Sequence, residues 1–118
     1  MTKKGIVGGK IRLEYFDQNE DFARSFPAQT CDVIQRFSST DGADNWFLLK
    51  LDKPFTYEGI ENTHLLVRSR WRESEIGGKE PTSVFILLVS DKTLLKDPLD
   101  IASFRHVAWG MAYAMQKV

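Results

Sequence analysis

Three arginines and a histidine are the residues of this sequence best suited to bind a charged group. Arg68, Arg70 and Arg72 are spaced two apart in a segment predicted to be a strand, and a strand would place them all on one face. His64 falls on the same face. Guanidinium groups bind phosphate and carboxylate through paired N–H donors. The spacing therefore predicts an anion-binding stripe about 13 Å long, at a rise of about 3.3 Å per residue.

A solvated outer strand face explains the same arginines, because antiparallel strands commonly turn apolar residues inward and polar residues outward. Acidic side chains on neighbouring strands would then pair with them, and the candidates are Glu14, Glu58, Glu61 and Glu73. Aromatic residues interleaved with the arginines would favour nucleic acid, but Trp71 falls on the opposite face. The 16 basic and 16 acidic residues of the chain also cancel, whereas nucleic-acid-binding proteins are usually basic. The sequence therefore favours an anionic ligand or an acidic partner over nucleic acid.

A second group, Arg105, Trp109 and Tyr113, lies in a segment whose apolar spacing predicts an α-helix from Pro98 to about Gln116. Trp109 and Tyr113 are four apart and would be neighbours on the surface of that helix. Large aromatics beside a charged side chain are typical of protein–protein interfaces. The pattern predicts a homodimer that forms through the helix. A barrel wrapped around the helix would bury the same aromatics within one chain, and the sequence does not separate the two.

No catalytic or metal-binding constellation is apparent in the sequence. Cys31, His64 and His106 have none of the spacings of a zinc site, and a single cysteine forms no disulfide within the chain. The sequence therefore predicts a non-enzymatic binding module that needs no metal or cofactor. The alternative is an enzyme or small-ligand binder with a pocket between sheet and helix. There Arg68 or Arg70 would hold a carboxylate or phosphate, and His64 would act as acid or base.

Alternation of apolar and polar residues predicts the strands that position these groups. The five expected strands are 11–16, 31–37, 46–51, 63–72 and 83–90. The near-continuous apolar run of the fifth strand predicts burial on both of its faces. Asp97 and Pro98 are residue types that suit an N-cap and a first helical position, so they mark the expected start of the C-terminal helix. A short helix is also predicted near residues 19–26.

The predicted fold is α+β. Tight turns between successive strands favour an antiparallel five-stranded sheet, strongly curved or closed into a partly open small barrel, with the C-terminal α-helix packed on it. Residues 1–9 are expected to form a flexible N-terminal tail. Residues 10–118 are expected to form a single globular domain, since 118 residues are close to the common size of one domain. Without a signal-peptide pattern or a membrane-spanning apolar run, a soluble cytoplasmic protein with no membrane partner is expected.

Overall fold

The computed structural model describes residues 7–17, 22, 24, 26, 28–70, 82–89 and 92–114. These residues form six strands and two short 3-10 helices. In chain order they are β1 (Lys10–Asp17), β2 (Gln29–Phe37), β3 (Trp46–Tyr57), β4 (Ile60–Ser69), β5 (Thr82–Leu88), η1 (Lys92–Leu94), η2 (Ile101–Ser103) and β6 (Arg105–Ala114).

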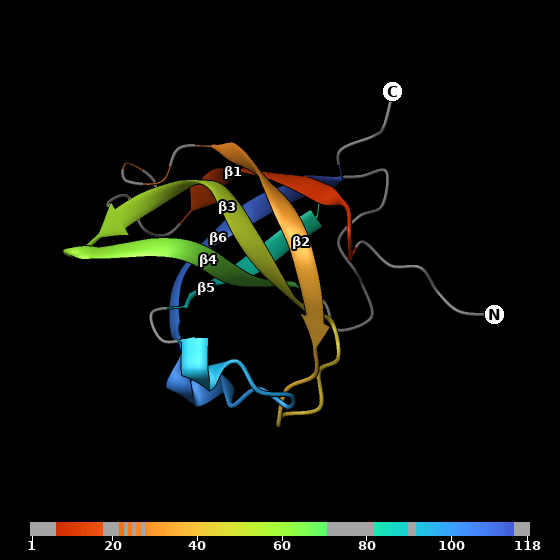
Figure 1. The fold of residues 1–118 in the computed structure, drawn as a ribbon. Coiled ribbons are helices and arrows are strands. Elements are labelled where there is room, and N and C mark those ends of the chain that lie inside the picture. Colours follow the sequence, from red (N-terminus) through yellow and green to blue (C-terminus); the bar gives the residue numbers. More distant parts are fainter. Residues whose placement is uncertain are drawn as a thin grey trace.

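The six strands form a closed barrel in which each strand lies antiparallel to the next (Figure 1). β6 completes the ring by pairing with β1. A two-residue turn joins β3 to β4 at Glu58 and Gly59, whose φ angles of 51° and 81° suit a type I′ hairpin. β3 continues through Pro54, where its register with β4 shifts between Lys50 and Phe55. An irregularity of this kind is where a strand accepts a proline.

Apolar side chains from all six strands fill the inside of the barrel. Leu65 and Val67 of β4 point inward and are 0% exposed. Phe22 and Phe26, which follow β1, pack against the far part of β3, with the ring centroids of Phe26 and Phe55 4.9 Å apart. Side chains just fill the interior of an eight-stranded barrel, so the narrower six-stranded interior is a packed core. A binding site is therefore expected on the outside of the barrel.

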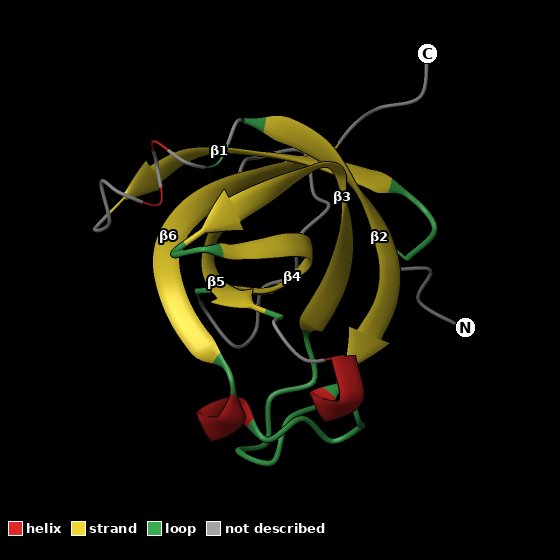
Figure 2. Cartoon of the chain, turned by 60° about the vertical axis from the view of Figure 1, so that its left-hand side comes forward, coloured by secondary structure: helices red, strands yellow, loops and turns green. Residues whose placement is uncertain are grey.

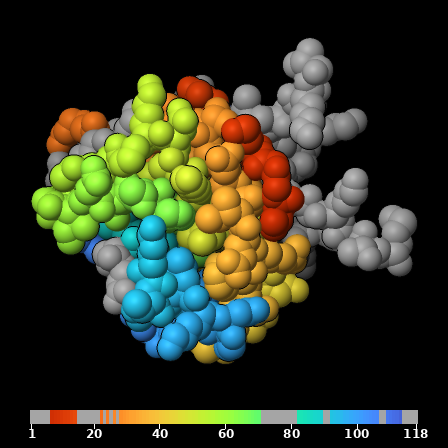
Figure 3. All heavy atoms as spheres, viewed as in Figure 1, coloured from red at the N-terminus to blue at the C-terminus, as the bar shows by residue number. Residues whose placement is uncertain are grey.

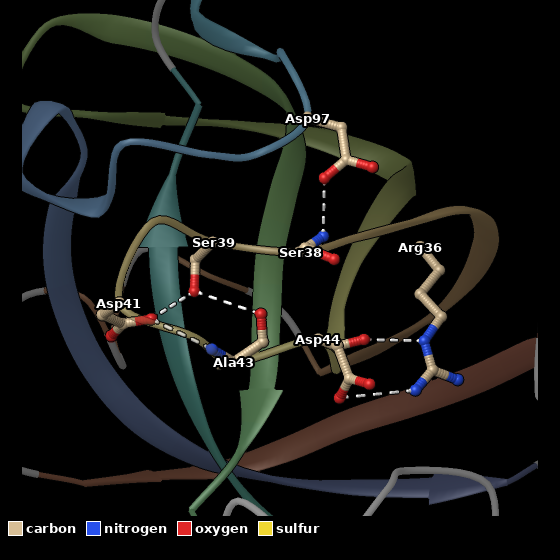
Figure 4. A network of polar contacts seen from close by, with 7 residues as sticks. All are labelled: Arg36, Ser38, Ser39, Asp41, Ala43, Asp44 and Asp97. Atoms are coloured by element: carbon tan, nitrogen blue, oxygen red, sulfur yellow. Dashed lines mark hydrogen bonds and ion pairs between the residues drawn. The ribbon is translucent and has the colours of Figure 1, made fainter.

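A second apolar cluster lies on the outer face, beneath two segments that cover it. Its members are Phe37, Ala43, Trp46, Leu48, Leu66, Leu87, Val89 and Leu99. The covering segments, 38–45 and 92–104, are hydrogen-bonded to each other. Leu99 N–H donates to Ser38 O at 2.7 Å, and the Asp97 carboxylate accepts from Ser38 N–H at 2.9 Å (Figure 4). In Figure 3 the cyan and blue atoms of the second segment pack beside the orange end of β2.

The α+β prediction is wrong, because the segment expected to be the C-terminal helix forms strand β6 instead. β6 pairs with both β5 and β1 and so closes the barrel. Its inward positions include the small residues Gly110 and Ala112, and its outward positions include Trp109, Met111 and Tyr113. The alternation is therefore one of size rather than polarity. Apolar residues on both faces also match a helical spacing, and the sequence pattern therefore favoured a helix.

The residues expected to start that helix join two loops. The Asp97 carboxylate binds the backbone of Ser38 instead of capping a helix, and Leu99 forms an isolated β-bridge with Ser39. The nearest helical turn is η2, which ends before β6 begins; η1 and η2 lie at the same end of the barrel (Figure 2). None of the helices in the described parts of the chain has the length and hydrophobicity that crossing a membrane requires.

The predicted short helix near residues 19–26 lies mostly outside the described residues. Within it, Phe26 N–H donates to Phe22 O at 2.9 Å, a spacing of one helical turn. Residues 1–6 of the predicted N-terminal tail are also outside the described ranges. Gly8, which the same prediction placed in the tail, donates its N–H to Val33 O of β2 at 2.8 Å.

The five predicted strands are present, although the third, expected over 46–51, continues to Tyr57. Their antiparallel pairing and the small-barrel alternative are confirmed. The barrel is six-stranded and closed rather than five-stranded and partly open. Burial of β5 on both faces is confirmed as well, because Ile86 faces the inner core and Leu87 the outer cluster. The strand expected at 63–72 begins earlier, at Ile60, and is described as far as Ser69.

Candidate functional site

One row of side chains crosses four neighbouring strands on the outside of the barrel. Trp46 on β3 is directly opposite Arg68 on β4, Arg68 is opposite Phe85 on β5, and Phe85 is opposite Trp109 on β6. Directly paired residues of antiparallel strands share one face of a sheet. We call these four residues the outer row. In this order, the guanidinium group of Arg68 has an aromatic neighbour on each side.

The members of the outer row are in contact. The guanidinium carbon of Arg68 lies 5.4 Å from the ring centroid of Trp46 and 4.8 Å from that of Phe85. The rings of Phe85 and Trp109 lie 4.0 Å apart at 38°. The two arginine distances are within the range of cation–π contacts, and the rings of Phe85 and Trp109 touch. The outer row is therefore a continuous line of contacting rings with one guanidinium group between them.

Arg70 adds a second cation beside the outer row. Its backbone N–H donates to Ser83 O at 2.8 Å, which keeps it tied to β5 just past the end of β4. Its guanidinium carbon lies 4.9 Å from the ring centroid of Trp109, and its side chain is exposed. A guanidinium that stacks on a ring uses its flat face, while its N–H donors point sideways in the plane. Stacking and anion binding are therefore compatible in both arginines.

A pocket of about 270 Å³ opens beside the outer row. Its walls are formed by Asp41, Trp46, Arg68, Phe85, Leu87, Ile101 and His106. The His106 ring meets Phe85 edge to face at 5.5 Å and Trp109 at 5.8 Å. Whole small-molecule sites usually measure about 300–1,000 Å³. This pocket therefore suits a single ring-sized group.

Asp41 brings a carboxylate to the pocket from the loop between β2 and β3. It accepts hydrogen bonds from the Ser39 hydroxyl and, at 3.3 Å, from Ala43 N–H (Figure 4). The Arg36 side chain of β2 donates to the carbonyl of Asp44 in the same loop at 2.7 Å. These bonds hold the loop, and with it the position of the carboxylate. The pocket thus combines flat apolar walls with an acceptor on one side and a guanidinium on another.

Trp46 is a buried wall of the pocket with an unused donor. It is 3% exposed, and its indole N–H has no hydrogen-bond acceptor among the described residues. A buried donor without an acceptor destabilises a fold by about 1–3 kcal/mol. Such groups are uncommon in folded proteins, and one at the wall of a pocket adds to the case for a binding site.

The predicted anion site is only partly assembled. Arg68 and Arg70 lie on the outer face as expected, but Arg72 lies outside the described residues. His64 also faces outward, yet it does not line the pocket; its Nδ1 lies 2.8 Å from Thr63 Oγ1. Burial, with the charges of Lys92 and Lys50, lowers the pKa of His64. The acid–base role beside the arginines is not supported by this arrangement.

The predicted self-association residues occupy three separate environments. Arg105 forms a bidentate ion pair with Glu58, with one N–H···O distance of 3.0 Å, and so ties the start of β6 to the β3–β4 turn. This hydrogen bond raises the pKa of Arg105 and lowers the pKa of Glu58. Trp109 belongs to the outer row. Tyr113 lies opposite Arg12 of β1, on the same face as Trp109 and about 13 Å along the strand.

Three pocket residues, Trp46, Phe85 and His106, were missed as site residues from the sequence. They come from three different strands, and only the pairing register brings them beside Arg68. The lone Cys31 is buried, which raises its pKa to about 12, with further contributions from nearby acidic groups. Within the described ranges no three His, Cys, Asp or Glu side chains gather as a metal site.

The chain matches no protein-family model, no curated protein and no solved structure at a significant level. The geometry of the outer face is therefore the basis for a functional proposal.

Proposed function

We propose that this protein is a non-enzymatic binding module that holds an anionic partner on the outer face of β4–β6. The observation that carries the proposal is that Arg68 and Arg70, neighbours on that face, are both stacked on aromatic rings. An arginine side chain carries about 2 kcal/mol of rotamer entropy, part of which is lost when it is fixed on a ligand. Stacking restricts both guanidinium groups before the partner arrives, which favours tighter binding.

The distribution of charge elsewhere on the barrel fits this choice of face. Lys10 lies 2.7 Å from Asp32, and Arg12 lies 2.7 Å from Glu14. Exposed pairs of this kind contribute little to stability, but each cancels a positive charge locally. A chain of zero net charge can therefore still place two cations side by side on one face, as Arg68 and Arg70 are.

The test is a double substitution, Arg68→Gln with Arg70→Gln, assayed for binding of inorganic polyphosphate and of a labelled single-stranded oligonucleotide. We expect the affinity to fall at least about tenfold, because two charge-assisted contacts are removed. The dependence of log affinity on log salt should become shallower by about 1.4, or about 0.7 for each lost phosphate contact with a single strand.

The matched control is Lys50→Gln with Lys53→Gln, which removes the same charge from exposed positions of β3 outside the outer row. It should leave the affinity within about twofold of the wild type, since remote exposed charges are screened by salt. An equal loss of affinity in the control and in the arginine variant would contradict the proposed face.

A second candidate function is self-association through the outer face of β6. Trp109, Met111 and Tyr113 follow one another there, each partly exposed. Aromatic and methionine side chains are enriched in protein interfaces. The Trp109→Ala, Tyr113→Ala variant should sediment as a monomer where the wild type sediments as a dimer. A monomeric wild type would eliminate this candidate and leave the anion site untouched.

A further inference from the structure

We propose, resting on the anion-binding function above, that the partner is a single-stranded nucleic acid, one base of which enters the pocket beside the outer row while Arg70 holds an adjoining phosphate.

The size of the pocket limits what enters it to part of a ligand. At about 270 Å³ it is smaller than the usual volume of a whole small-molecule site. Arg68 and Phe85 belong both to the pocket and to the outer row, so the two are continuous. A ligand with one group in the pocket therefore extends over the Phe85–Trp109 pair toward Arg70. A chain of ring-bearing, anionic units fits this path.

The walls of the pocket favour a nucleobase over an acidic side chain. Phe85 and His106 offer ring surfaces beside the buried Trp46, and unstacked bases pack on such rings and on guanidinium planes. The edge of a base carries donors as well as acceptors, and the Asp41 carboxylate accepts from an exocyclic amine. A carboxylate of an acidic peptide would instead meet Asp41 as a like charge. The same wall thus attracts a base and repels an acid.

The order of rings and cations along the outer face also fits a single strand. Proteins that bind single strands combine aromatic platforms with backbone-directed cations. Here Arg68 stacks between Trp46 and Phe85, and Arg70 stacks on Trp109. A chain with equal numbers of basic and acidic residues gains little from bulk attraction. The affinity should therefore depend on the bases more than on the number of phosphates.

The experiment compares four probes on the wild-type protein by fluorescence anisotropy and competition. They are a labelled single-stranded DNA of about ten nucleotides, an abasic oligomer of the same length, inorganic polyphosphate, and poly-glutamate. We expect the base-bearing strand to bind at least about tenfold more tightly than the abasic strand, because stacking on the rings is lost without bases. It alone should quench the tryptophan fluorescence.

A substitution of Phe85, which belongs to both the pocket and the outer row, tests the preference for the base-bearing strand directly. Phe85→Leu should weaken the base-bearing strand about tenfold and leave the abasic strand within about twofold. Met111→Leu, on the same outer face but away from the pocket, is the matched control and should change neither affinity. Near-UV circular dichroism of both variants checks that the fold is retained, and the four-probe comparison needs no variant at all.

Three results would overturn the inference in distinguishable ways. If DNA, abasic strand and polyphosphate bind equally well, and the Arg68 and Arg70 substitutions abolish all three, the anion-binding function stands and the base site falls. If poly-glutamate binds as tightly as the DNA, the partner is an acidic polypeptide and not a nucleic acid. If no probe binds, both proposals fall together.

Discussion

The guanidinium carbon of Arg68 lies 4.8 Å from the ring centroid of Phe85, the residue directly opposite it on β5. On its other side it lies 5.4 Å from the ring of Trp46, its opposite residue on β3. One cation thus links three strands on the outer face. Because the position is half-buried, the contact is stronger than a cation–π pair in open water. Arg68 therefore supports the barrel as well as the candidate site.

Arg68→Lys is expected to destabilise the protein by about 1 kcal/mol in urea unfolding, because an ammonium keeps the charge but loses the flat face that lies between two rings. Arg12→Lys is the control, since Arg12 makes a partly exposed ion pair with Glu14 that a lysine can replace. Equal stability of Arg68→Lys and the wild type would show that the rings, and not the cation between them, hold these strands together.

The ion pair between Arg105 and Glu58 should give the protein a dependence on acid. The hydrogen bond from Arg105 lowers the pKa of Glu58 below its usual value of 4.5. A carboxylate with a lowered folded pKa contributes stability that is complete above the unfolded pKa and is lost as the pH falls through the folded value. Glu58→Gln should remove this contribution, so its melting temperature should fall less than that of the wild type on acidification below about pH 4.5.

Glu61→Gln on the same hairpin is the control for this measurement, because Glu61 is equally exposed. Its acid dependence should match that of the wild type. Both Glu58 and Arg105 are exposed, so high salt should reduce the difference between Glu58→Gln and the wild type. A difference that is insensitive to salt would point to lost packing against the turn instead of a lost ion pair.

His64 should titrate below its usual value of 6.5, because burial and the charges of Lys92 and Lys50 disfavour its protonated form. The unfolded chain then binds this proton at a higher pH than the folded protein does. The contribution of His64 to stability is therefore complete above about pH 6.5 and declines as the pH falls through its folded pKa. Lys92→Gln should raise the pKa of His64 in an NMR titration. An unchanged pKa would locate its cause in burial and the charge of Lys50.

Cys31 should be protected from thiol reagents in the folded protein. It is 1% exposed, and burial raises its pKa to about 12, so very little thiolate is present near pH 8. We expect labelling of the native protein to be at least about a hundredfold slower than labelling of the urea-unfolded chain. The chain has one cysteine, so a single rate is measured. Equal rates with and without urea would mean that β2 opens readily around this side chain.

Sequence periodicity was sufficient to predict features that lie within one strand. The alternation along β4 correctly turned Leu65 and Val67 inward and Arg68 outward. The apolar run of β5 correctly indicated burial on both faces. These features depend on near neighbours in the chain, because side chains alternate across a strand with a period of two.

The outer row could not be predicted in this way, because it depends on pairing between distant segments. On the arginine strand itself, alternation assigns the aromatic Trp71 to the face opposite the arginines. The aromatics that contact Arg68 are Trp46 and Phe85, which reach it from the neighbouring strands. Register between strands is set by turns, bulges and closure of the whole sheet, and periodicity within one strand does not report it.

The strand identity of β6 can be tested at Ala112, which is 1% exposed inside the barrel and pairs with Leu13 of β1. Ala112→Leu inserts a large side chain into a packed interior, so we expect a loss of about 1–3 kcal/mol in urea unfolding. Its neighbour Met111 points outward, and Met111→Leu should stay within about 0.5 kcal/mol of the wild type. In the helix expected from the sequence, Met111 belongs to the core-facing stripe and would be the more sensitive of the two positions. The relative cost of these substitutions therefore distinguishes a closed barrel from a sheet covered by a helix.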